Sequence, residues 1–161
     1  MRKCWEKMDT ENLLKSLNEY EVDYVIIGTT AFPIHGYSRA TLDIDILIIP
    51  TEKNAQNTLL ALKKFGYDMD DVSVSDILSK KILIRQSILE TDIHPFVKGV
   101  AVEEIWKNKV PGKIGEVSCY FASLDDLIRM KEAAGRGKDK EDLRFLKKIE
   151  EKLLADQQSA L

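Results

Sequence analysis

The 161-residue chain is poor in cysteine, histidine and proline, with two, two and four residues respectively. Cys4 and Cys119 have no CxxC spacing and no neighbouring histidine, so neither a zinc knuckle nor a disulfide framework is expected. The hydrophobic runs are only as long as a strand, so no segment is expected to span a membrane. A signal peptide is not expected either, because Glu6, Lys7 and Asp9 stand where an apolar stretch would begin.

An excess of positive charge is also lacking. The 24 Lys and Arg residues are outnumbered by 27 Asp and Glu, which gives a formal net charge of −3. This balance argues against a protein whose main task is to coat nucleic acid, although it allows a local basic patch. With 44% hydrophobic and 32% charged residues, the composition is that of a globular protein. We expect one cytoplasmic domain over 1–161, with a core at about 10–155 and a frayed tail from 156.

The order of the predicted elements favours an α+β or mixed α/β domain, with one mixed sheet flanked by helices. Runs of apolar and β-branched residues predict strands at 24–28, 42–49, 82–85, 88–94 and 116–121. Caps and helical periodicity predict helices that begin near Asp9 or Thr10, at Thr29, after Thr51, near Ser75, near Glu103, after Ser123 and near Asp139.

The strongest chemical signal is the pair Asp43 and Asp45, which lies within the apolar run 42–49. Side chains two residues apart on a strand share a face, so the two carboxylates are expected to lie together. Crowded carboxylates in apolar surroundings repel each other and lose solvation, and a bound divalent cation relieves both costs. The other interpretation is an exposed strand end, because a lone D-x-D occurs often by accident.

A candidate phosphate site precedes the acidic pair. Gly28 ends the first predicted strand, and Thr29 and Thr30 open a predicted short helix over 29–35. A helix N-terminus offers free N–H groups and a positive dipole end, which suit a triphosphate. Glycine lets the backbone approach a ligand closely, and the two hydroxyls add donors. A phosphate site followed closely by a carboxylate pair favours a site for nucleotidyl transfer over a D-x-D that occurs by chance.

Residues 24–49 read YVIIGTTAFPIHGYSRATLDIDILII, and this stretch resembles the signature of the nucleotidyltransferase superfamily. The resemblance is to its small bacterial and archaeal branch of minimal nucleotidyltransferases, which is related to toxin–antitoxin proteins. The matching residues of this stretch are Gly28, His35, Gly36, Arg39, Thr41, Asp43 and Asp45. Further matches are Asn54, Phe65, Gly66, Asp92, Lys131, Arg136, Lys138, Asp139 and Asp142. Thr29 departs from the pattern, in which Gly or Ser follows the first glycine.

The resemblance implies transfer of a nucleoside monophosphate from an NTP to an acceptor hydroxyl, with release of pyrophosphate. It implies two Mg²⁺ ions, or Mn²⁺, held by the catalytic residues Asp43, Asp45 and Asp92. The residues that it implies for nucleotide binding are Gly28, Thr29, Thr30, Arg39, Lys131, Arg136 and Lys138. The acceptor stays open between an RNA end, a protein hydroxyl and a small molecule. A homodimer or a toxin–antitoxin-type partner is also compatible with the resemblance.

Several residues have a second interpretation. Arg39 either neutralises phosphate charge or lies in a surface turn. His35 and His94 are expected to be structural, although His94 would share the strand face of Asp92. Glu90 lies on that face too and is the rival third carboxylate.

Two alternative functions remain open. A catalytically weak or inactive protein on the same fold, acting as a nucleotide-binding or antitoxin-like partner, is favoured by Thr29. A metal-dependent hydrolase would use the three aspartates together with His94, but no histidine-containing metal motif supports it.

Overall fold

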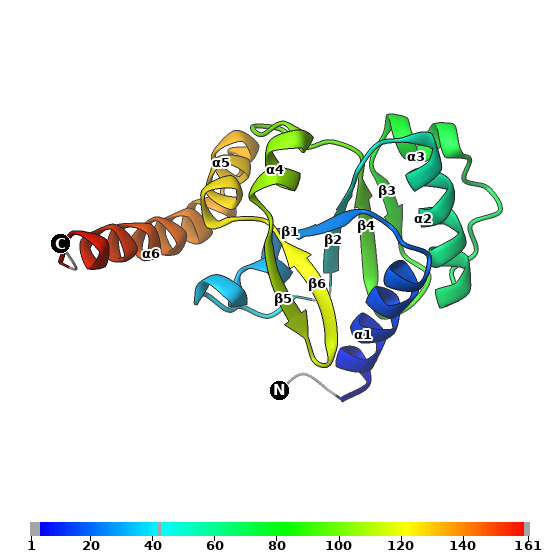
Figure 1. The fold of residues 1–161 in the computed structure, drawn as a ribbon, viewed down its shortest axis with the longest axis horizontal. Coiled ribbons are helices and arrows are strands. Elements are labelled where there is room, and N and C mark those ends of the chain that lie inside the picture. Colours follow the sequence, from blue (N-terminus) through cyan, green and yellow to red (C-terminus); the bar gives the residue numbers. More distant parts are fainter. Residues whose placement is uncertain (1–3, 42, 160–161) are drawn as a thin grey trace.

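The computed structural model describes residues 4–41 and 43–159 (Figure 1). The helices are α1 (Cys4–Glu19), α2 (Glu52–Phe65), α3 (Val74–Ser79), α4 (Val102–Asn108), α5 (Leu124–Ala134) and α6 (Asp139–Ser159). The strands are β1 (Tyr24–Ile27), β2 (Asp43–Ile48), β3 (Ile82–Ile84), β4 (Glu90–His94), β5 (Val110–Ile114) and β6 (Val117–Phe121). Among these residues, no helix combines the length and the apolar character that a membrane span needs.

All the described strands form one six-stranded mixed sheet with the order β3-β4-β2-β1-β6-β5. Strands β1 and β2, β3 and β4, and β5 and β6 pair antiparallel, whereas β2–β4 and β1–β6 are parallel. Helices flank the sheet, so the predicted mixed α/β architecture is confirmed. Figure 1 shows α2 and α3 beside the β3–β4 end of the sheet, while α5 and α6 lie on the opposite side of the molecule.

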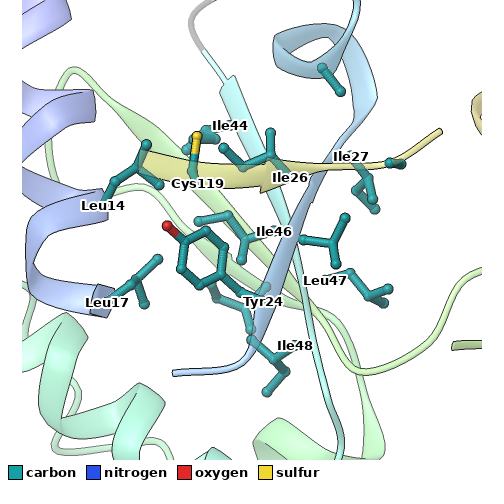
Figure 2. Close-up of a cluster of buried hydrophobic side chains, with 14 of the residues drawn as sticks. Leu14, Leu17, Tyr24, Ile26, Ile27, Ile44, Ile46, Leu47, Ile48 and Cys119 are labelled. Carbon is teal, nitrogen blue, oxygen red and sulfur yellow. The ribbon is translucent and has the colours of Figure 1, made fainter. Parts of the chain in front are cut away.

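The hydrophobic core explains which face of β2 carries the acids. Ile44, Ile46 and Ile48 are buried and pack with residues of β1 and α1 such as Tyr24 and Leu14 (Figure 2). Burying an aliphatic side chain of this size stabilises the fold by about 1.5–3 kcal/mol. Because side chains alternate along a strand, burial of the isoleucines turns Asp43 and Asp45 to the other face.

A buried asparagine holds the two central strands in place. Asn54, in the first turn of α2, accepts a 2.8 Å hydrogen bond from the Asp23 backbone N–H. Its Nδ2 donates to the carbonyl oxygens of Asp23, at 2.9 Å, and Ile49, at 2.8 Å. These bonds join the residue before β1 to the residue after β2, so they stabilise the register of both strands. The helix itself begins at the predicted cap, because Thr51 Oγ1 accepts from the Asn54 N–H.

Two local predictions differ from the structure, and a third falls on a residue outside the described ranges. The predicted helix over 29–35 is instead two 3₁₀ turns, Gly28–Ala31 and Pro33–His35. Pro33 has no N–H to donate to Thr29, so an α-helix cannot continue through it. Helix α1 starts at Cys4 rather than near Asp9 or Thr10, and Thr10 is buried within it. Residue Leu42, the predicted start of the second strand, lies outside the described residues.

Two further differences concern the last third of the chain. Strand β5 was missed because Pro111 and Gly112 are unfavourable in strands, but β5 is an edge strand, where proline is tolerated. The tail predicted to fray from Asp156 is helical through Ser159, since α6 continues to that residue.

Candidate functional site

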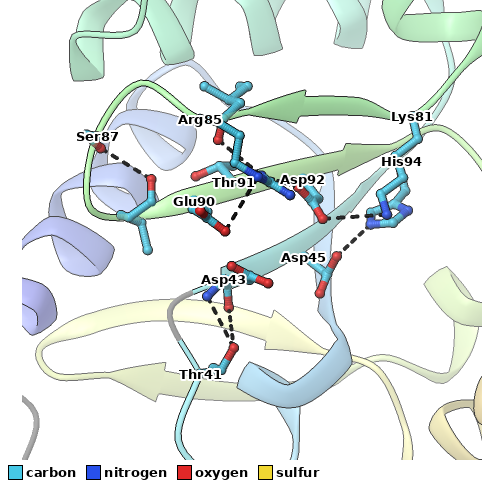
Figure 3. A network of polar contacts seen from close by, with 12 residues as sticks. Thr41, Asp43, Asp45, Lys81, Arg85, Ser87, Glu90, Thr91, Asp92 and His94 are labelled. Carbon is cyan, nitrogen blue, oxygen red and sulfur yellow. Dashed lines mark hydrogen bonds and ion pairs between the residues drawn. The ribbon is translucent and has the colours of Figure 1, made fainter. Parts of the chain in front are cut away.

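Four carboxylates lie on one face of the sheet, where β2 and β4 run parallel. Asp43 is in register with Glu90, and Asp45 with Asp92. Residues in register on neighbouring strands project to the same side, so these four form a carboxylate row across two strands. Figure 3 shows the row facing one space, together with His94. The third acidic position predicted from the sequence, Asp92, is therefore beside Asp45 in space.

One part of the row has the geometry of a metal site. Ligand atoms of Asp45, Asp92 and His94 all lie within 4.8 Å of one another. His94 Nε2 is 2.8 Å from Asp45 Oδ1. Two carboxylates and an imidazole are a donor set that a divalent cation can bind. The metal-ligand role of Asp43 stays a prediction. His94 was expected to be structural while sharing the strand face of Asp92, and the structure places it within reach of the same ion.

The other part of the row is a pair of close carboxylates. A hydrogen bond with Asp43 raises the pKa of Glu90 above its usual value of 4.5, and burial and repulsion by Asp43 act in the same direction. Arg85 acts in the opposite direction, with Nε 3.5 Å from Glu90 Oε2. Crowding of acids is therefore found between Asp43 and Glu90, which belong to different strands.

Two cations that sequence reasoning missed hold Asp92. Arg85 Nη1 donates to Asp92 Oδ1 at 2.7 Å, and Lys81 Nζ lies 3.5 Å from Asp92 Oδ2 (Figure 3). We call Lys81 and Arg85 the edge wall, because they flank β3, the edge strand of the sheet. Lys81, Leu83 and Arg85 are spaced two residues apart in the sequence, so they share one face of the strand. Only the pairing of Leu83 with Asp92 brings the two cations to the site.

The backbone conformation at Gly28 and its close contact with Asp45 both require glycine. Its φ is +71°, and a Cβ at this position would lie 2.6 Å from Asp45 Oδ2. Any larger residue would therefore displace the central carboxylate. Thr29 lines the same cavity as Asp45. The hydroxyl of Thr30 instead donates to the Asp43 carbonyl oxygen at 3.2 Å, and so helps to hold β2.

Asp43, Asp45 and Asp92 of the carboxylate row line a cavity of about 860 Å³. Apart from Thr30, every site residue predicted from the sequence contributes to its lining. Four further cations line the cavity near α5 and α6, which Figure 1 shows across the molecule from β3. They are Arg39, Lys131, Arg136 and Lys138, which we call the helix wall. The cavity therefore brings together residues from the first quarter of the chain, the middle hairpin and the last two helices.

Two buried aspartates organise the helix wall. Asp139 and Asp142, at the start of α6, have side chains that are only 1% and 2% exposed. Lys131 Nζ donates to Asp139 Oδ1 at 2.9 Å, and Arg136 Nε donates to Asp139 Oδ2 at 2.9 Å. Burial alone would raise the pKa of Asp139, but these two hydrogen bonds lower it to about 2. Asp139 therefore stays ionised and fixes both cations.

Asp142 does the same for Arg39. The guanidinium binds it in a bidentate manner, with Nε 2.9 Å from Oδ1 and Nη2 3.0 Å from Oδ2. Lys131 Nζ is 3.3 Å from Asp142 Oδ2, so the two aspartates share a cation. Burial raises the pKa of Asp142, but hydrogen bonding by Arg39 and attraction by Lys131 lower it overall. Arg39 thus joins the loop before β2 to α6, rather than lying unattached in a turn.

His35 lies apart from these groups. Its Nε2 is 2.8 Å from the Ala122 carbonyl oxygen, and donation across this distance joins the second 3₁₀ turn to the end of β6. This contact accounts for His35 without a role in the cavity.

A comparison with known families matches almost the whole chain. The family model described as "Nucleotidyl transferase of unknown function (DUF2204)" covers residues 6–159. The matched range contains the carboxylate row and both walls. No curated protein matches the sequence.

Proposed function

Since the chain belongs to this family of nucleotidyl transferases of unknown function, we propose that it transfers a nucleoside monophosphate from an NTP to an acceptor hydroxyl. The acceptor oxygen forms a bond to the α-phosphorus, while the bond from that phosphorus to the pyrophosphate breaks. The observation that carries the proposal is the cavity, in which the carboxylate row lies between two groups of cations. Chemistry of this kind depends on positioning and on charge neutralisation, and the cavity supplies groups for both.

The carboxylate row fits a divalent cation. Asp45 and Asp92 place oxygen atoms close enough to share one ion, and Asp43 is two residues from Asp45 on the same face. We propose that these three aspartates hold Mg²⁺ or Mn²⁺, which prefer oxygen ligands. When bound, the metal would neutralise charge on the reacting phosphate and lower the pKa of the acceptor hydroxyl. His94 would orient Asp45 through their 2.8 Å contact, as groups hydrogen-bonded to metal ligands commonly do.

The remaining roles follow from the positions of the side chains. The triphosphate would lie between the Gly28–Thr29 turn and the helix wall, where Arg39, Lys131 and Arg136 supply positive charge. Because buried aspartates already hold these cations in place, their side chains would lose little conformational freedom when the triphosphate binds. Asp92 would accept the proton that leaves the acceptor hydroxyl.

A second candidate function is favoured by one observation. His94 joins Asp45 and Asp92 in the group that can bind a metal, and such mixed sets also occur in metal-dependent hydrolases. In that case water would replace the acceptor, and the labelled nucleotide would be released free. A non-catalytic nucleotide-binding protein, for which Thr29 is the argument, would give neither product.

The decisive experiment follows the α-phosphate. The protein is incubated with each α-labelled NTP, Mg²⁺ or Mn²⁺, and a cell extract, and label is followed in macromolecules, small molecules and free NMP. Transfer predicts labelled acceptor and pyrophosphate, whereas hydrolysis predicts free NMP. Asp45→Asn and Asp92→Asn should abolish either product, and Asp70→Asn, an exposed control, should not.

Thermal-shift measurements complete the test without an acceptor. At least one of ATP, CTP, GTP and UTP should stabilise the protein, and only when the divalent metal is present. If no NTP shifts the melting temperature and no labelled product forms, the proposed function is wrong.

A further inference from the structure

The edge wall has a different kind of partner from the helix wall. Lys131, Arg136 and Arg39 bind aspartates that are buried within α6. Among the described residues, the ion-pair partners of Lys81 and Arg85 are instead Asp92 and Glu90, which belong to the carboxylate row. The edge wall therefore depends for its counter-charge on the groups that are proposed to do the chemistry.

The two walls also lie on opposite sides of the carboxylate row. In the sheet order, β3 is beyond β4 at one edge, whereas β1, which leads into Gly28, is on the other side of β2. Asp92 is on the strand nearest the edge wall, and Asp45 is the carboxylate nearest Gly28. A nucleotide on the Gly28 side would thus leave the edge wall facing whatever approaches Asp92 from the other direction.

A metal at Asp92 would change the situation of the edge wall. Arg85 and Lys81 now contact the two oxygens of Asp92, at 2.7 and 3.5 Å, so a divalent cation must compete with them. Like charges at such distances repel each other even in water. The Lys81 and Arg85 side chains are 50% and 40% exposed, and both line the cavity, so they are free to turn to another anion.

We infer that the edge wall binds a phosphate group of the acceptor, so that the acceptor is an alcohol that also carries phosphate. This inference rests on the proposed function and names its second substrate class. Arg85 and Lys81 already clamp one anion from two sides, which shows that their spacing suits an oxyanion. A phosphate monoester offers three terminal oxygens and a phosphodiester two, and either number is enough for the fork of Arg85 and the ammonium of Lys81 at once. Both a phosphorylated small molecule and a nucleic-acid end have this chemistry.

The experiment measures acceptor binding rather than turnover. Fluorescence anisotropy follows a labelled single-stranded RNA octamer with a free 3′ hydroxyl, and ribose 5-phosphate and ribose serve as competitors. We expect Lys81→Gln/Arg85→Gln to weaken phosphate-dependent binding by about tenfold or more, as loss of charge-assisted hydrogen bonds should. Nucleotide affinity, measured by thermal shift, should change much less. Arg136→Gln/Lys138→Gln, the matched pair from the helix wall, should show the reverse pattern.

The effect of Mg²⁺ is the sharpest readout. Unspecific phosphate binding weakens when Mg²⁺ is added, because the ion competes as a counterion. Binding to the edge wall should strengthen, since metal at Asp92 frees Arg85 and Lys81. If ribose 5-phosphate but not ribose displaces the RNA, one phosphate is enough for recognition, as a small phosphorylated acceptor requires. If the RNA binds and ribose 5-phosphate does not displace it, the site needs a nucleic-acid end.

A second measurement needs no acceptor. Arg85→Gln should tighten Mn²⁺ binding by about 2–5-fold, because a partly exposed ion pair of this kind contributes up to about 1 kcal/mol. Arg136→Gln should leave Mn²⁺ affinity unchanged. The inference is wrong if the parent binds neither phosphate ligand, if the edge-wall double variant binds both as the parent does, or if Mg²⁺ only weakens binding. If metal-dependent NTP binding persists in that case, the proposed function stands without it; if NTP binding is absent too, both fail.

Discussion

The two cationic walls of the cavity obtain their counter-charge in different ways. On the helix wall, each of Lys131, Arg136 and Arg39 is held by a carboxylate that is buried and lies outside the carboxylate row. On the edge wall, Lys81 and Arg85 are held by carboxylates of the row itself. The first arrangement does not involve the groups that would bind a cation, whereas the second must rearrange when the row binds one. A cavity can therefore combine a preformed subsite with one that responds to its ligand.

The two sides should also respond to pH in opposite directions. Asp139, behind the helix wall, has a pKa lowered to about 2, so its ionisation stabilises the folded protein. Glu90, beside the edge wall, has a raised pKa, so its ionisation costs stability.

Removing the charge behind the helix wall should have the largest effect. Asp139→Asn leaves Lys131, which is 13% exposed, without its closest carboxylate, so unfolding free energy should fall by about 3 kcal/mol. Urea denaturation measures this loss, with the exposed Asp156→Asn on the same helix as the control. Because the contribution of Asp139 is complete above its unfolded pKa and disappears as pH falls towards 2, parent and variant should converge between about pH 4 and pH 2. A gap of constant size across this range would contradict the assignment.

Between the two walls, Gly28→Ala should have an intermediate effect. The positive φ of +71° costs a non-glycine residue about 1–2 kcal/mol, and the new Cβ would press on Asp45 Oδ2. We expect a stability loss of about this size together with at least about tenfold weaker Mn²⁺ binding, measured by calorimetry. Gly135→Ala is the matched control, since its φ is +62° but its nearest atom is 4.0 Å away. It should lose stability without losing metal affinity, and equal metal loss in both variants would refute the role of the contact.

The smallest effect is expected from Glu90→Gln beside the edge wall. The variant removes the repulsion between Glu90 and Asp43, so its melting temperature should exceed that of the parent at pH 7. The parent is spared this cost below the usual pKa of 4.5, where Glu90 is protonated, and incurs it as pH rises through the raised pKa. The advantage should therefore vanish near pH 4. The exposed Glu103→Gln should show no such trend, and a destabilised Glu90→Gln at pH 7 would mean that its pair with Arg85 outweighs the repulsion.

Local pattern was enough to predict the centre of the site. Alternation within β2 places Asp43 and Asp45 opposite the buried isoleucines, and this depends only on the two-residue period of a strand. The caps Thr51 and Ser123 were also predicted from local pattern, because a cap side chain bonds to a backbone N–H only three residues away. The family pattern supplied Asp92 and the cations of the last two helices, which no local rule would have connected to β2.

What only the tertiary structure decided is the pairing of charges across long distances in the chain. Lys81 and Arg85 meet Asp92 because β3 and β4 form a hairpin in one particular register, and a shift by one residue would turn them to the other face. His94 reaches Asp45 through the parallel pairing of β2 with β4, and Arg39 reaches Asp142 only after α6 packs against α5. The sequence by itself determined which residues can carry the chemistry, because side-chain type and strand or helix period are local properties. Which cation neutralises which carboxylate was left to the fold, because that choice depends on contacts between segments whose separation in sequence carries no signal of their distance in space.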